Sequence, residues 1–170
     1  MLKRLRQSLT AGTASKRNQF FPEIPLAGFG FLTHFVWEML QVPWYQGMAE
    51  ESHGSVVWLC IRATGGDVLI FLLSFWASSI LCGNRRWLLE GDRKPALIVV
   101  TIALLATIVL EWLATGPLER WAYADSMPII MLLEVGLTPL LQWVLLLPLL
   151  LWLTRRHMLG RIALRSDSTV

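Results

Sequence analysis

The sequence predicts an all-α polytopic membrane protein, a four-helix transmembrane bundle with both termini in the cytoplasm. Three observations support this fold class. Hydrophobic residues make up 55% of the 170 residues, and 9 residues are tryptophan. Four long apolar segments run through the chain, each close to the ~20 residues that a helical span needs. Basic residues gather in only some of the connecting segments, which predicts an orientation.

The predicted transmembrane domain covers residues 23–154. Its spans are expected at residues 24–45, 67–82, 95–114 and 127–154, and the second and shortest is completed by part of 62–66. Between the first two spans, the segment 52–64 combines apolar side chains with Trp58. This composition is consistent with a short helix in the outer interface, and an extension of the second span explains it equally well.

The basic residues predict which loops are cytoplasmic. Residues 1–22 and 155–170 are expected to form basic tails, and the first tail lacks the apolar region of a signal peptide. The loop 83–94 holds four basic residues, whereas the loops 46–66 and 115–126 hold one arginine each. Both termini and the second loop are therefore predicted to be cytoplasmic. The net charge of +3 reflects this orientation, and no nucleic-acid partner is expected.

Polar residues interrupt the first predicted span. His34, Glu38, Gln41 and Tyr45 fall within a ~60° stripe when each residue turns the helix by about 100°. An ionisable side chain inside a span costs roughly 2.5–3.5 kcal/mol on insertion scales, and such residues usually mark a function. The stripe therefore predicts a functional site.

Polar residues of the other spans are expected at the same depth. Because successive spans alternate in direction, Asp67 begins the second span at the outer face and Glu111 lies within about one turn of the outer end of the third. Glu134 is expected about two turns into the fourth span, and Thr138 and Gln142 continue its face at i+4 spacing. This shared depth favours a site, although hydrogen bonding between helices is a structural alternative.

Aromatic residues concentrate on the same outer side, where an interfacial belt explains most of them. Some can instead line a pocket, because the faces of aromatic rings attract cations or a developing carbocation. The candidate ligand-binding residues are Trp37, Gln41, Tyr45, Asp67, Trp112, Trp121, Tyr123, Glu134, Thr138 and Gln142.

The chain resembles a group of small uncharacterised bacterial four-span membrane proteins in three motifs. They are H-F-V-W-E-M-L-Q-V-P-W-Y at 34–45, W-A-Y-A-D-S-M-P at 121–128 and V-G-L-T-P-L-L-Q-W at 135–143. The resemblance covers most of the chain and implies a multi-pass protein of the bacterial cytoplasmic (inner) membrane. It implies no particular activity.

A more distant resemblance is to the EXPERA group, which includes the sterol Δ8-Δ7 isomerase and the sigma-2 receptor. His34-x-x-x-Glu38 resembles its His-x-x-x-Glu pair, and Glu111 followed by Gly116-Pro117-Leu118 and Trp121 resembles its Glu followed by G-P-L and Trp, at a shorter spacing. This resemblance implies a proton-shuttling isomerase acting on an apolar isoprenoid- or lipid-like molecule.

In that reaction the catalytic residues would be His34, Glu38 and Glu111. Glu38 would be the acid and His34 the relay, while Glu111 with Trp112 or Trp121 would stabilise the cation. The residues also permit this chemistry on physical grounds, because a glutamate surrounded by hydrocarbon keeps its proton near neutral pH and can act as a general acid.

Two other functions are consistent with the same residues. His34 and Glu38 at i and i+4 can ligate zinc, iron or manganese, with Glu111, Asp67 or Glu134 completing the shell. Alternatively, the chain is a non-catalytic accessory or lipid-binding subunit. A homo-oligomer is a further possible assembly. The expected partners are membrane lipids and a hydrophobic small molecule, no cofactor is expected, and the motifs G-x-S-x-G and H-E-x-x-H are absent.

Overall fold

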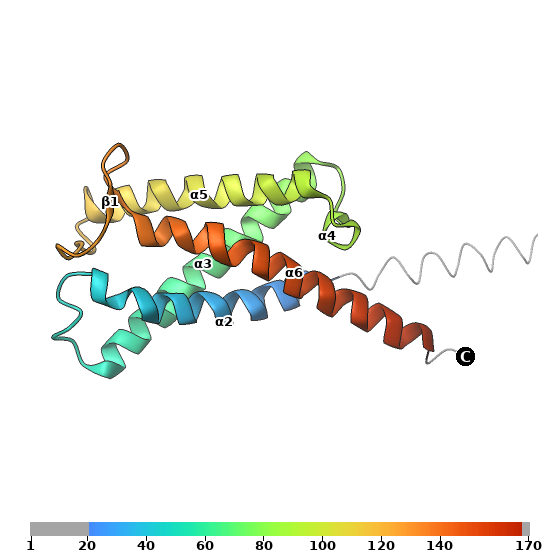
Figure 1. The fold of residues 1–170 in the computed structure, drawn as a ribbon, viewed down its shortest axis with the longest axis horizontal. Coiled ribbons are helices and arrows are strands. Elements are labelled where there is room, and N and C mark those ends of the chain that lie inside the picture. Colours follow the sequence, from blue (N-terminus) through green and yellow to red (C-terminus); the bar gives the residue numbers. More distant parts are fainter. Residues whose placement is uncertain (1–20, 168–170) are drawn as a thin grey trace, which may run out of the picture.

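The computed structural model describes residues 21–167. Most of them are helical, which confirms the predicted all-α class. The long helices, shown in Figure 1, are α2 (Glu23–Gln41), α3 (His53–Leu81), α5 (Arg93–Thr115) and α6 (Leu137–Asp167). The short elements are η1 (Val42–Trp44), α4 (Trp87–Glu90), β1 (Ile129–Ile130) and β2 (Val135–Gly136). Residues 1–20 of the predicted N-terminal tail, and 168–170, lie outside the described residues.

Three of the described helices are long and apolar enough to cross a membrane. They are His53–Leu81, Arg93–Thr115 and the Leu137–Leu164 part of α6. The chain is therefore a multi-pass membrane protein. Helix α2 has 19 residues, which corresponds to about 28 Å at 1.5 Å per residue.

The long helices alternate in direction, and each packs against two others. α2 contacts α3 and α6, and α5 contacts the same two helices. Figure 1 shows α3 crossing the others obliquely. One end of the bundle is formed by the loops 42–52 and 116–136. We call it the hairpin end, because β1 and β2 pair there as a β-hairpin. The opposite end, formed by residues 82–92, is called the α4 end.

The apolar core lies toward the α4 end. Its largest side chains are Phe71, Phe75, Trp87 and Trp143, and all are almost completely buried. The indole nitrogen of Trp87 donates a 3.1 Å hydrogen bond to the hydroxyl of Ser79. The buried imidazole, amide and carboxyl groups lie toward the hairpin end instead.

The segment 52–64 does not form a separate interfacial helix. It forms the first turns of α3, which continues without a break for 29 residues. Ser52 caps this helix by accepting a hydrogen bond from the backbone N–H of Ser55, a common start signal. The structure thus agrees with the alternative, an extension of the second span.

The predicted start of the fourth span at residue 127 is wrong. Residues 129–136 form an antiparallel hairpin in which Ile129 pairs with Gly136 and Ile130 with Val135. Glu134 has φ of 54°, a left-handed conformation that an α-helix cannot contain, and β-branched residues favour the strands. Helix α6 therefore starts at Leu137. It continues to Asp167, so much of the predicted tail 155–170 is helical.

The first prediction concerns topology. If α2 crosses the membrane like the other long helices, tags at either terminus and at Glu90 should react only in permeabilised cells. Labels near Glu50 and Asp125 should react in intact cells. Labelling of the same positions after permeabilisation is the control. Termini on opposite sides would mean an odd number of spans and would remove the argument from shared depth.

Candidate functional site

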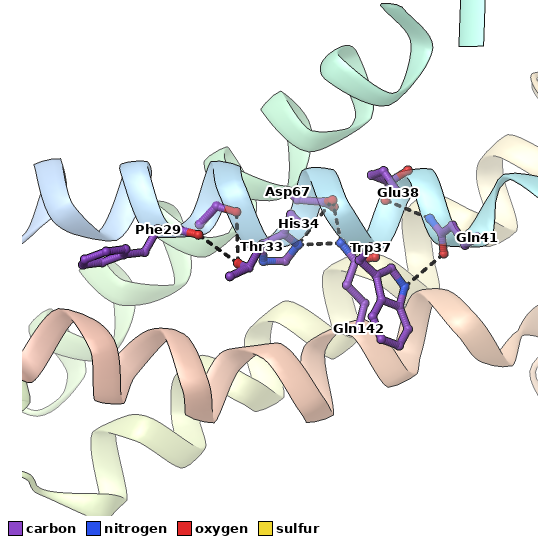
Figure 2. A network of polar contacts seen from close by, with 9 residues as sticks. Phe29, Thr33, His34, Trp37, Glu38, Gln41, Asp67 and Gln142 are labelled. Carbon is purple, nitrogen blue, oxygen red and sulfur yellow. Dashed lines mark hydrogen bonds and ion pairs between the residues drawn. The ribbon is translucent and has the colours of Figure 1, made fainter. Parts of the chain in front are cut away.

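A buried histidine on α2 is connected to α3 and α6 through one glutamine side chain (Figure 2). His34 is 0% exposed. The amide nitrogen of Gln142 lies 2.5 Å from Nδ1 of His34 and donates a 2.7 Å hydrogen bond to Oδ2 of Asp67. Nδ1 of His34 is 3.4 Å from the same carboxyl oxygen. Side chains from three helices therefore meet at one point.

The contact with Gln142 matches one tautomer of a neutral imidazole. An amide nitrogen is only a donor and has two hydrogens, so Gln142 can donate to both Asp67 and His34. A neutral imidazole that accepts this bond at Nδ1 carries its proton on Nε2. Nε2 is buried and has no hydrogen-bond partner among the described residues.

A second polar cluster lies one turn further along α2. Nε2 of Gln41 donates a 2.8 Å hydrogen bond to Glu38, and the indole nitrogen of Trp37 donates a 3.2 Å bond to Oε1 of Gln41 (Figure 2). Glu38 also lies beside Asp67 (Figure 2), and the two carboxyl groups interact electrostatically. The two clusters are therefore linked through Asp67.

The third carboxyl group comes from α5. Glu111 is 8% exposed, and one of its oxygens accepts hydrogen bonds from the hydroxyl of Tyr123 at 2.5 Å and from the indole of Trp121 at 3.3 Å. The ring of Tyr45 packs against both aromatic rings, with centroids 5.8 Å from Tyr123 and 6.4 Å from Trp121. Three aromatic side chains thus surround Glu111 at the hairpin end.

The loops at the hairpin end hold these aromatic side chains in place. Tyr45 and Tyr123 form an isolated β-bridge. Burial raises the pKa of both tyrosines, and the hydrogen bond to Glu111 raises the pKa of Tyr123 further. Both phenols therefore stay protonated at physiological pH, and Tyr123 remains a hydrogen-bond donor to Glu111.

Carboxyl groups outnumber basic groups in this site. Glu38, Asp67 and Glu111 interact electrostatically with one another. Among the described residues that bond to these three carboxyls, His34 is the only one with a basic side chain. Two like charges 4 Å apart repel by about 4 kcal/mol at an effective dielectric constant of 20. Repulsion of this kind disfavours the ionisation of all three carboxyls at once.

Most of the predicted site residues lie in these connected clusters. They are His34, Trp37, Glu38, Gln41, Tyr45, Asp67, Glu111, Trp121, Tyr123 and Gln142.

Three predicted residues do not join the clusters. Glu134 is exposed in the turn of the hairpin, because it is not on a helix as predicted. Trp112 is 52% exposed, since it follows Glu111 directly and points about 100° away from it. Thr138 is buried, but its hydroxyl donates to the sulfur of Met127 at 3.4 Å.

The sequence analysis missed two buried threonines near the carboxyl groups. Thr64 lies three residues before Asp67 on α3, and Thr107 lies four residues before Glu111 on α5. Both hydroxyls are buried without a hydrogen-bond partner among the described residues. Their i+3 and i+4 spacing from the acidic residues was the available signal.

The structure does not support the metal site proposed for His34, Glu38 and Glu111. Within residues 21–167, no three His, Cys, Asp or Glu side chains are placed to hold a metal ion. Among the residues that the structure describes, Nδ1 of His34 is hydrogen-bonded only to Gln142, and Glu111 is bonded to two aromatic side chains.

A groove of about 400 Å³ opens next to the aromatic cluster at the hairpin end. Tyr45, Gln46, Tyr123 and Asp125 are among the residues that line it. A ligand in the groove would contact the two tyrosines that cover Glu111. No family model, curated protein or solved structure matches the chain.

The second prediction tests the hydrogen bond to Glu111. Tyr123→Phe removes one of its two donors, and the unsatisfied carboxyl should lower the free energy of unfolding by about 1–3 kcal/mol. The matched control is Tyr45→Phe, which keeps the ring contacts. Melting temperatures in detergent should fall by several degrees for the first variant only. Equal melting temperatures for both variants would contradict this role of Tyr123.

The third prediction tests the connection between the three helices. Gln142→Met keeps the side-chain length but removes the donor shared by His34 and Asp67, so stability should fall by about 1–3 kcal/mol. Gln46→Met, at an exposed position, is the control. A Gln142→Met protein that melts like the wild type would show that the amide does not hold the helices together.

Proposed function

We propose that this chain is a four-span protein of the bacterial inner membrane with both termini in the cytoplasm. Its site binds an isoprenoid- or lipid-like molecule in the outer half of the bilayer and exchanges a proton with it. The observation that carries this proposal is the placement of Glu38 beside Asp67 and His34, in one group of side chains from α2 and α3 (Figure 2). Such a pair of carboxyls can hold a proton on one member and accept a proton with the other.

The surface of α2 supports its assignment as the fourth span. Its exposed residues include Ile24, Leu32, Val36 and Leu40, each at least 57% exposed. The opposite side of α2 packs against α3 and α6. A helix with an exposed apolar face and a buried polar site is better solvated in lipid than in water.

The proposed acid is accessible, whereas the proposed relay is not. Glu38 is only partly buried, so an apolar molecule can approach it from the bilayer without unfolding the protein. His34 is completely buried and connects to Glu38 through Asp67. We therefore assign Glu38 as the proton donor, Asp67 as its acceptor partner and His34 as the relay, because Nδ1 of His34 lies 3.4 Å from Asp67 and can take up a proton from it.

The aromatic cluster supports the second half of the proposed reaction. Protonation of an alkene creates a carbocation, which the face of an aromatic ring and a nearby carboxylate stabilise. Trp121 bonds to Glu111 and packs against Tyr45, so we assign this role to Trp121 rather than to Trp112. Loss of a proton from a neighbouring carbon then completes an isomerisation, with no net gain or loss of protons.

A non-catalytic lipid-binding subunit is the second candidate. It is favoured by the extent to which the site's side chains already bond to one another, because Glu38 and Glu111 both accept hydrogen bonds within the protein. In that case the carboxyl clusters would hold the helices together and the groove would bind lipid.

The fourth prediction distinguishes these functions. Glu38→Gln keeps the shape of the side chain and removes its acidic proton, so labelling by a photoreactive isoprenoid or sterol probe should fall about tenfold, equivalent to ~1.4 kcal/mol. His34→Gln and Glu111→Gln should also reduce labelling. The melting temperature of Glu38→Gln should stay close to that of the wild type.

Glu134→Gln is the matched control, since it removes an exposed carboxyl from the same end of the protein. Labelling of the control should equal that of the wild type. If all three site variants label like a binding wild type, the accessory function is the one that survives. A wild type that is labelled no more than an unrelated membrane protein would contradict ligand binding.

A further inference from the structure

The tip of the hairpin between α5 and α6 is apolar and exposed. Residues 128–134 read P-I-I-M-L-L-E, and Met131 and Leu132 are 84% and 92% exposed. Turns that face water usually contain Gly, Asn, Asp or Ser. The geometry of the turn therefore does not explain why apolar side chains are exposed at its tip.

The base of the hairpin is firmly attached to the protein. Met127 and Val135 are buried, and the backbone N–H of Leu137 donates a 2.7 Å hydrogen bond to Pro128. A side-chain carbon added to Gly136 would lie 3.1 Å from both Tyr123 and Met127. The tip therefore projects from a fixed base, and its side chains do not pack into the core.

The surroundings of the hairpin indicate a lipid environment. The hairpin connects two helices that can each cross a membrane, and Figure 1 shows it running across the direction of α5. On α5, Val109, Leu110 and Trp112 are about half exposed and continue the apolar surface. Tryptophan is enriched where membrane helices meet the lipid–water interface.

We infer that residues 129–133 insert into the outer leaflet of the bilayer, at its interface with water. A second copy of the chain fits this tip less well, because a stable protein interface buries about 800 Å² and 20–30 residues per partner. The tip has no basic residue, and Glu134 and Asp125 beside it are acidic. Insertion should therefore depend on apolar contact and not on anionic headgroups.

This inference rests on the membrane placement of α5 and α6 and not on proton exchange at Glu38. The insertion of the tip and the proposed function can therefore fail independently. The test uses the full chain with Cys60→Ala and Cys82→Ala, and a single Leu132→Cys carrying an environment-sensitive fluorophore. Asp125→Cys, exposed at the same end, is the matched control. Both proteins are reconstituted in phosphatidylcholine vesicles with spin-labelled lipids.

The Leu132 label should emit at shorter wavelength than the Asp125 label and be quenched by lipids that carry the spin label near the headgroup. Neither added salt nor anionic lipid should change this. Iodide in the buffer should quench only the Asp125 label. Equal iodide quenching of both labels would overturn the inference. In a parallel sample, a second copy of the protein carries the spin label instead of the lipid. Quenching of the Leu132 label in that sample, and not by spin-labelled lipid, would also overturn the inference.

Discussion

The amide of Gln142 is the contact on which the arrangement of the site depends. In the hydrocarbon interior no water is available, so polar groups must find partners within the protein. One amide nitrogen from α6 satisfies an imidazole acceptor on α2 and a carboxyl acceptor on α3. This contact sets the rotation of α2 about its axis. Because Glu38 lies one turn beyond His34, the same rotation directs Glu38 toward Asp67.

The two ends of the protein have different roles. At the α4 end, Trp87 fills the apolar core, and Glu23 at the start of α2 accepts hydrogen bonds from Arg85 and from the indole of Trp76. Arg155 on α6 donates a 3.1 Å bond to the carbonyl of Leu89. These contacts hold the helices in register, so that the hairpin end can carry carboxyl groups whose burial is unfavourable.

The hairpin connects its exposed apolar tip to the site. Gly136 follows the apolar tip and lies against Tyr123, which donates to Glu111. A Cβ at that position would lie 3.1 Å from the side chains of Tyr123 and Met127, so both would have to shift slightly. A hairpin held in the outer leaflet would therefore help to hold the phenol that covers the third carboxyl group. The bilayer then acts as part of the structure that positions the site.

The sequence by itself determined the helical class, the three helices apolar enough to cross a membrane and most members of the site, because hydropathy and helical periodicity are local properties. His34, Glu38 and Gln41 share one face of a helix wherever that helix packs. The tertiary structure alone decided the rest. The backbone conformation of the hairpin exposes Glu134, the loop after α5 brings Trp121 to Glu111 instead of Trp112, and Gln142 bonds to Asp67, 75 residues earlier. These outcomes depend on how loops fold and how helices rotate against one another, and neither is encoded in the periodicity of a single helix.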